Sequence, residues 1–365
     1  MFLGDRIRQA REIRGLTQDG LASKIDRSKA LIAQVEAGFK LPTPELIESV
    51  AVATRFPITF FDEPPHTEFP VSEILLRARR SIKRREVLET VRYAEHVFAV
   101  FAMLASRLKH IPVALPECSD PTEAAKRVRK MFGVEESSPI QNLVHLIERA
   151  GVYFLMLPPA EEREAFCVWL RRDDAEYPVI AAAGGREDGD RFRLSVAHEL
   201  GHLVMHKSFL RKSNREVEDE AFAFAAELLM PTKGMRETII PPVTISSLAK
   251  LKPTWGVSIA ALIRRTHELG IITTRQYHYL FHQLSSLGYR EREPKNLDVP
   301  LEKPRLLRKM AELIYGKPIN FNVFSAETNL SASELRSILV DYEAGFTADI
   351  KVSSRVIRFS KPTAK

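Results

Sequence analysis

The chain has 365 residues, of which 45% are hydrophobic and 28% are charged, and its formal net charge is +7. This length is typical of two or three domains, and this composition argues against intrinsic disorder of the whole chain. The sequence has no apolar run of the roughly 18 residues that a membrane-spanning helix needs, and its first segment lacks the apolar stretch of a secretory signal. Two cysteines, Cys118 and Cys167, cannot build a disulfide framework, so we expect a cytoplasmic protein without a membrane partner.

The hydrophobic pattern predicts a mainly α chain with a small β-sheet, which is an α+β fold. Residues 3–60 are predicted to form short helices, and residues 62–72 contain three prolines and are predicted to be a linker. The sheet is predicted from three short apolar runs, at residues 151–157, 165–170 and 177–183. Further helices are predicted at residues 72–110, 121–150, 191–207, 216–230, 244–288 and 305–315, with a last short strand at 350–359.

The N-terminal stretch LTQDGLASKIDRSKALIAQVEAGFK has the local signals of two short helices joined by a tight turn. Thr17 and Ser28 are suitable N-caps, and Gly38 can end the second helix in a left-handed conformation. Such a pair is a helix-turn-helix, whose second helix can enter the major groove of DNA.

This stretch resembles the Xre/lambda-repressor type of helix-turn-helix over about residues 3–60. The matching residues are Gln18, Leu21, Ala22, Ser28, Ile32, Glu36 and Gly38. The resemblance implies that Gln18 and Arg27 approach phosphates, and it places Ser28 at the DNA-binding end of the second helix. It also implies that Lys29, Ala30 and Gln34 face base edges. Asp26 stands where glycine is usual in the turn.

The N-terminal helices, and a basic run further along the chain, each allow more than one interpretation. The N-terminal helices could form a module that binds protein rather than DNA. The run RARRSIKRR at residues 77–85 has six basic residues and could contact phosphates, or it could be the solvated face of a long helix.

The strongest chemical signal is RFRLSVAHELGHLVMH, at residues 191–206. His198 and His202 are four residues apart, which places both imidazoles on one face of a helix, within reach of one metal ion. Zinc binds imidazole nitrogens and can keep one coordination position open for water. Glu199 is the candidate general base, because its carboxylate could take the proton of that water. His206 could support the site or only end the helix.

A third metal ligand is expected from the next acidic helix, NREVEDEAFAFAAELLMP, at residues 214–231. Glu220 shares one face of this helix with Glu216 and Glu227, whereas Glu218 and Asp219 are expected to point elsewhere. Glu220 lies at the edge of the apolar part, 22 residues after His198, and is therefore the predicted ligand.

Residues from about 125 to 231 resemble the ImmA/IrrE family of metallo-endopeptidases, through RFRLSVAHELGHLVMH and EAFAFAAELLMP. The resemblance implies a zincin-like α+β domain with a gluzincin-like Zn²⁺ site. Its ligands would be His198, His202 and Glu220, with Glu199 as the general base. Phe222 is a departure, because the family commonly has asparagine there. Residues 248–290 resemble the helical extension of family members that are fused to a DNA-binding domain.

Together these resemblances imply a regulator that binds an operator-type DNA duplex and hydrolyses a peptide bond in a partner protein, such as a repressor or an antitoxin. The alternative is a transcription factor whose metallopeptidase-like domain only senses a ligand or a metal. Because repressor-type domains usually bind paired half-sites, we expect a homodimer.

The predicted domains are a helix-turn-helix domain at 1–61, a linker at 62–72, a helical connector at 73–120, a zinc metallopeptidase-like domain at 121–235, a helical extension at 236–293 and a C-terminal segment of unassigned role at 294–365.

Overall fold

The computed structural model describes residues 4–64, 69–71, 84–108, 112–158, 165–172, 175–183, 189–207 and 214–340. The predicted linker at 62–72 and the basic run at 77–85 lie partly outside the described residues, and the strand predicted at 350–359 lies wholly outside them.

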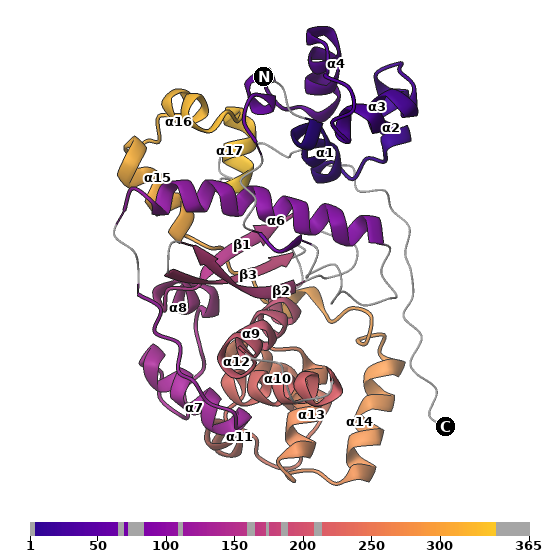
Figure 1. Cartoon of the computed structure of the whole chain (residues 1–365). Helices are drawn as coiled ribbons and strands as arrows, with labels where there is room; N and C mark the ends of the chain where they lie inside the picture. Colours follow the sequence, from indigo (N-terminus) through magenta and orange to yellow (C-terminus); the bar gives the residue numbers. More distant parts are fainter. Residues whose placement is uncertain are drawn as a thin grey trace.

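Helices dominate the described chain and surround one small sheet, so the predicted α+β fold is confirmed (Figure 1). The N-terminal elements are α1 (Gly4–Ile13), α2 (Gln18–Lys24), α3 (Lys29–Glu36), α4 (Pro44–Thr54), the 3-10 helix η1 (Ile58–Phe61) and α6 (Arg84–Ala105). The central elements are α7 (Pro121–Phe132), α8 (Leu143–Arg149), β1 (Tyr153–Leu157), β2 (Ala165–Arg172), β3 (Ala175–Ala183), α9 (Gly189–Met205), α10 (Asn214–Leu229) and α11 (Thr232–Thr238). The C-terminal elements are α12 (Ile245–Trp255), α13 (Ile259–Glu268), α14 (Thr274–Ser286), η2 (Lys295–Leu297), α15 (Leu306–Tyr315), α16 (Phe321–Thr328) and α17 (Ala332–Ile338).

The sheet has the strand order β1-β3-β2. β1 runs parallel to β3, with Tyr153 opposite Val179, and β2 runs antiparallel to β3, with Cys167 opposite Ile180. Within the described residues, β2 is therefore an edge strand, and β3 is the central one.

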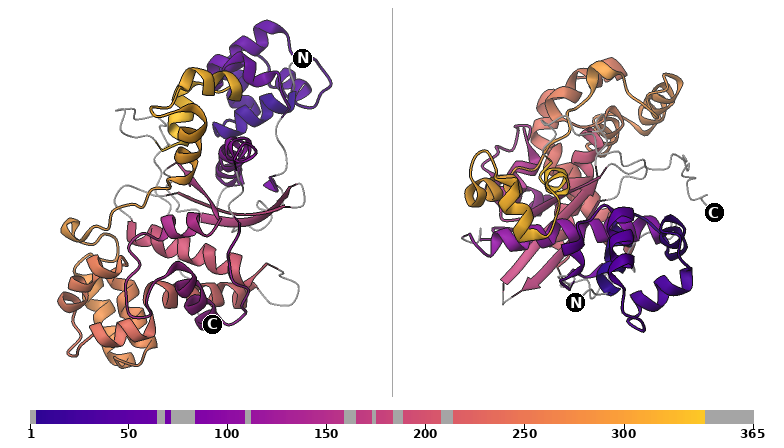
Figure 2. Two further views of the ribbon diagram at one scale, coloured as in Figure 1. Left: turned by 90° about the vertical axis from the view of Figure 1, so that its left-hand side faces the viewer. Right: turned by 90° about the horizontal axis from the view of Figure 1, so that it is seen from above.

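Every residue of β1 is buried, because both faces of the sheet are covered. Tyr153 and Leu155 belong to one apolar core with α6 and the N-terminal helices, whereas Phe154 and Met156 belong to a second core with α9 and α10. Successive side chains of a strand point to opposite faces, so this strand contributes to both cores. Figures 1 and 2 show the resulting layers, with α6 on one side of the sheet and α9 on the other.

Helix α6 lies between α1 and β1 and contacts both elements. Toward α1 the contacts include buried hydrogen bonds as well as apolar packing: the Gln9 amide donates to Glu95 (2.9 Å), and Arg92 donates to Glu12 (2.7 Å). Because Gln9, Glu12 and Glu95 are buried, these hydrogen bonds fix the position of the N-terminal helices on α6.

The helical extension is joined to the centre of the molecule by a buried charge cluster. Lys252 of α12 donates to Asp190, at the start of α9, and to Glu293 (2.8 and 2.5 Å). Two carboxylates around one buried ammonium group satisfy its charge and tie α12 to α9. Among the described residues, no helix is both long and apolar enough to cross a bilayer.

Candidate DNA interface and metal centre

The N-terminal helices α2 and α3 are held by the caps that the sequence predicts. The Thr17 side chain accepts from the backbone N–H of Gly20, and the Ser28 side chain accepts from that of Leu31 (2.9 and 3.2 Å). In the turn between the helices, Asp26 has a φ of 52°, in the left-handed region that glycine usually occupies. Aspartate tolerates this region better than most residues, so the turn forms without glycine.

The buried carboxylate of Glu36 joins the three helices around this turn. It accepts from Arg11 of α1 through both oxygens (2.6 and 2.9 Å) and from the Gln18 amide (2.9 Å). A carboxylate that accepts from one guanidinium group through both oxygens is held in a defined geometry, so this contact fixes the position of α3 relative to α1. The half-buried Gln18 side chain is fixed by this contact. That it approaches a phosphate remains a prediction.

The other predicted DNA contacts lie together on the open side of α3 and at its start. These side chains are all exposed: Arg27, Ser28, Lys29, Ala30 and Gln34. Ile32 and Val35 of the same helix are buried. The helix therefore presents one polar, accessible face, which has the position and chemistry that a recognition helix needs.

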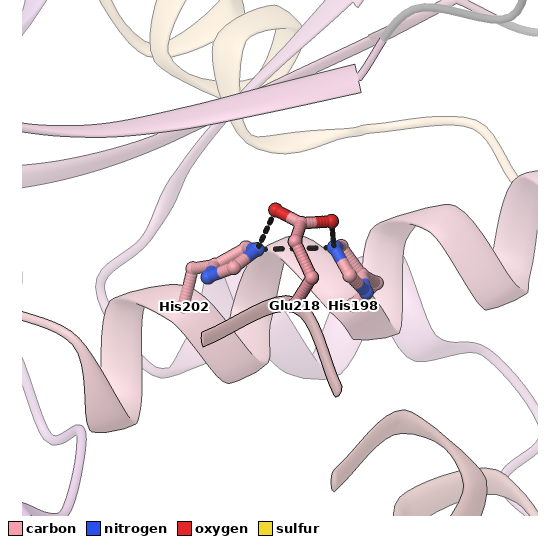
Figure 3. A group of neighbouring side chains, drawn as sticks. All are labelled: His198, His202 and Glu218. Atoms are coloured by element: carbon pink, nitrogen blue, oxygen red, sulfur yellow. Dashed lines mark hydrogen bonds and ion pairs between the residues drawn. The ribbon is translucent and has the colours of Figure 1, made fainter. Parts of the chain in front are cut away.

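Helix α9 and the start of α10 bring two imidazoles and a carboxylate together (Figure 3). His198 Nε2 and His202 Nε2 are 3.0 Å apart, with the rings nearly perpendicular, at 85°. The Glu218 oxygens lie 3.4 Å from His198 Nε2 and 3.5 Å from His202 Nε2. All three donor atoms lie within 4.8 Å of one another. The two imidazoles hold the pKa of Glu218 well below its usual value.

The chemistry of these donors fits a divalent metal ion. When both neutral imidazoles carry their proton on Nδ1, the two Nε2 lone pairs face the same point and have no donor between them. One cation among the three groups would accept lone pairs from both nitrogens and from a Glu218 oxygen. Two histidines and a carboxylate are a common zinc ligand set.

The structure places Glu218, rather than the predicted ligand Glu220, beside the histidine pair. Glu220 Oε2 instead lies 2.8 Å from His206 Nε2. Glu218 rather than Glu220 faces the histidine pair because of how α10 is rotated about its own axis. Glu218 shares a stripe with Phe222, whose ring packs on the His198 ring at 4.3 Å between centroids. The stripe of Glu220 continues to Glu227, which pairs with Arg265 on another side of the helix.

Glu220 and His206 form a chain of contacts that ends on His202. His202 Nδ1 lies 3.0 Å from His206 Nδ1, and His206 Nε2 lies 2.8 Å from Glu220. If His202 offers its Nε2 lone pair to a metal, its Nδ1 carries the proton and donates to His206, which in turn donates from Nε2 to Glu220. Such outer hydrogen bonds orient a ligand ring and fix its tautomer.

Glu199 lies next to this centre and is half-buried. Burial raises the pKa of its carboxyl, while the neighbouring His198 and His202 and a hydrogen bond with Cys167 of β2 act in the opposite direction. A carboxylate whose pKa is raised is a stronger base when it is ionised. The exposed ring of Phe222 lies at the same centre, where the resembling family commonly has asparagine.

Gly201 allows α9 and α10 to approach closely enough to build the centre. A Cβ atom at this position would lie 2.9 Å from the Phe224 ring and 3.4 Å from Ala221 Cα. The small residue between the two histidines is therefore what lets α10 lie close to α9.

The fold and these two sites define a helix-turn-helix protein with a metallopeptidase-like domain. The comparisons with known families agree. A family model described as a helix-turn-helix domain matches residues 3–59, and the model of the IrrE N-terminal-like domain, Peptidase_M78, matches residues 147–267. The chain therefore combines a helix-turn-helix domain with an IrrE-like domain, and the second match contains all three residues of the candidate metal centre.

One solved structure that resembles the chain is that of Bacillus thuringiensis PlcR in complex with the peptide PapR7 and DNA. The identity is 11%, and the match covers 79% of this chain and 97% of that chain, with a TM-score of 0.16. This similarity is too low to support an inference. No curated protein sequence matches the chain significantly.

Proposed function

We propose that the protein is a transcription regulator that binds operator-type DNA and carries a zinc-dependent endopeptidase. Its substrate would be a partner protein, such as a repressor or an antitoxin. The observation that carries this proposal is the convergence of His198, His202 and Glu218 directly beside Glu199. The exposed polar face of α3 supports the DNA-binding part.

In this proposal each residue of the centre has a separate task. His198, His202 and Glu218 would hold Zn²⁺, which when bound acidifies water and polarises a carbonyl group. Glu199 would take the proton from the attacking water and pass it to the leaving amine, as a general base and then a general acid. The contact with Cys167 of β2 holds the Glu199 carboxylate in place.

The metal site is tested first, by zinc content measured with plasma mass spectrometry. The wild type is expected to bind about one zinc ion per chain, and His202→Ala and Glu218→Gln are expected to lose it. Asp219→Asn is a matched control, because this exposed side chain lies next to Glu218 but outside the centre. A wild type that cannot be loaded with zinc would contradict the metal site.

Proteolysis is tested by searching for new protein N-termini in cells that express the wild type or Glu199→Gln. The variant should keep its zinc and generate none of the new termini, because amide oxygen is a far weaker base than carboxylate. Cleavage that persists in Glu199→Gln would reject the assignment of the base. Bound zinc without new termini in the wild type would favour the sensing alternative.

The DNA interface is tested on a duplex selected from random sequences. Lys29→Ala and Gln34→Ala should each change the base preference, with a loss of about 1–3 kcal/mol of discrimination at one position. Lys126→Ala, on the exposed face of α7, is the control for loss of one positive charge. Unchanged binding in both variants of α3 would show that it is not the recognition helix.

A further inference from the structure

A groove of about 340 Å³ lies beside the start of α9. Its walls come from the loop before α8, from the end of α12 and from residues 299–305, which we call the strap. The volume is within the range of small-molecule sites, at its lower end.

The strap is fixed in place by Glu302. One Glu302 oxygen accepts from the backbone N–H of Val144 in α8 (2.8 Å), and the other pairs with Arg193 of α9. Arg193 and Glu302 are both buried, so the pair ties the strap to α8 and α9 at the groove. The walls of the groove are therefore preformed rather than assembled from mobile side chains.

Arg193 contributes a buried positive charge to the groove. It is 3% exposed and donates to the Ile140 carbonyl (2.7 Å), while its Nε is buried and has no hydrogen-bond partner among the described residues. Gly256, in the opposite wall, lies so close that a Cβ atom there would be 2.8 Å from this Nε. Gly256 therefore packs directly against this N–H, and the charge of Arg193 is paired with Glu302.

The remaining charges at the groove are mostly positive. Lys303 and Arg305 of the strap line it together with Arg193, and the single lining carboxylate, Glu302, is already paired with Arg193. The amide side chains of Gln141 and Asn142 also line the groove and can donate hydrogen bonds.

The positive charge continues onto the adjacent surface of α8 and α15. Arg149, Arg305 and Lys309 form no ion pair with any described residue, and the carboxylate of Glu148 is buried and accepts the backbone N–H of Arg305 (3.0 Å). Burial lowers the pKa of His145, and the charges of these three cations lower it further. The potential here is therefore positive, and Glu148 offsets only part of the charge of Arg305 and Lys309.

We propose that this groove binds a small polyanion that carries phosphate or carboxylate groups. Arg305 and Lys303 would pair with the anionic groups at the mouth, and the amides of Gln141 and Asn142 would donate to them deeper in the groove. The strap leads into α15, which packs on α6, so the ligand would lie next to the scaffold that carries the N-terminal helices. This site is independent of the metal centre and of proteolysis.

The test uses the full chain and two probes, pyrophosphate and citrate, with binding measured by calorimetry. Tighter binding of pyrophosphate would identify the phosphate class, and tighter binding of citrate the carboxylate class. Arg305→Ala combined with Lys303→Ala should weaken binding at least about tenfold, because the two charge-assisted contacts at the mouth are removed. Both side chains are exposed, so the fold should persist, and Lys126→Ala is the control.

His145 gives a second readout, from the pH titration of its ring signals by NMR, assigned with His145→Gln. A bound anion neutralises the neighbouring cations, so the apparent pKa of His145 should rise when the probe is added. The proposal is overturned if neither probe binds more tightly than about 1 mM. It is also overturned if the double variant binds like the wild type, or if the His145 titration does not move.

Discussion

At the scale of single residues, the most informative group is the chain from Glu220 through His206 to His202. Both links are short, at 2.8 and 3.0 Å, and His206 is buried. Only one assignment of protons leaves the Nε2 lone pair of His202 directed toward His198 and Glu218. The carboxylate of Glu220 therefore fixes which nitrogen of His202 is free to bind a metal.

We predict that Glu220→Gln lowers the zinc affinity about 10–100-fold, as is typical when the hydrogen-bond partner of a ligand histidine is lost. The measurement is competition with a chromophoric chelator, with Asp219→Asn as the control on the same helix turn. Wild-type affinity in Glu220→Gln would show that the chain of contacts does not orient His202. Complete loss of zinc would instead make Glu220 a ligand.

The same residues show how far the sequence determines the site. The positions of His198, His202 and Glu199 follow from spacing within one helix, and the structure places the two histidine nitrogens 3.0 Å apart. Glu218 could not be chosen this way. Which stripe of α10 faces α9 depends on how the two helices pack, and that contact is not encoded by the local pattern of either helix.

At the scale of elements, the α9–α10 contact at Gly201 controls the geometry of the centre. Alanine at this position would favour the helix by about 1 kcal/mol, but the added Cβ would press on the buried Phe224 ring, and overpacking costs about 1–3 kcal/mol. The second effect is larger, because the Phe224 ring is fully buried and the Ala221 contact is with the helix backbone.

We therefore predict that Gly201→Ala destabilises the protein by up to about 2 kcal/mol and weakens zinc binding, since α10 carries Glu218. The measurement is the urea midpoint together with the zinc affinity. Gly20→Ala is a matched control with the opposite sign. It lies in α2, where the new Cβ would meet only the side chains of Thr17 and Leu16. It should stabilise its helix by up to about 1 kcal/mol. A stabilising effect of Gly201→Ala would contradict the close packing of α9 and α10.

The sequence predicts a helix or a strand correctly where one hydrophobic pattern covers the whole element. β1 is apolar throughout, and it is buried on both faces between two cores. The role of α6 was harder to predict, because the sequence treats residues 73–120 as a connector. Its packing against α1 depends on pairs such as Gln9 and Glu95, which are 86 residues apart in the chain.

At the scale of the whole molecule, three distant segments meet at Glu334 of α17. Arg14, which follows α1, donates to one Glu334 oxygen at 2.8 Å, and His96 of α6 lies 3.4 Å from the other. The Arg14 guanidinium also packs over the Phe56 ring. The C-terminal segment, which had no assigned role from sequence, therefore holds the helix-turn-helix domain against α6. Local patterns could not predict a contact between residues 320 positions apart.

This junction predicts a specific dependence of stability on pH. Burial alone would raise the pKa of Glu334, but His96 and Arg14 lower it to about 2, compared with an ordinary value of 4.5. A carboxyl whose folded-state pKa is depressed stabilises the fold above its unfolded pKa, and this contribution is lost as the pH falls from 4.5 toward 2. At pH 7 the contribution is about 3 kcal/mol.

Glu334→Gln should therefore be less stable than the wild type at pH 7, and the difference should shrink as the pH falls from 5 to about 2.5. Urea unfolding at a series of pH values measures this difference, and Glu48→Gln, on the exposed face of α4, should stay close to the wild type throughout. The variant should also loosen the helix-turn-helix domain, so amide exchange in α1 should rise at neutral pH and approach that of the wild type in acid. A stability difference that stays constant across this range would show that the charge of Glu334 does not hold the junction.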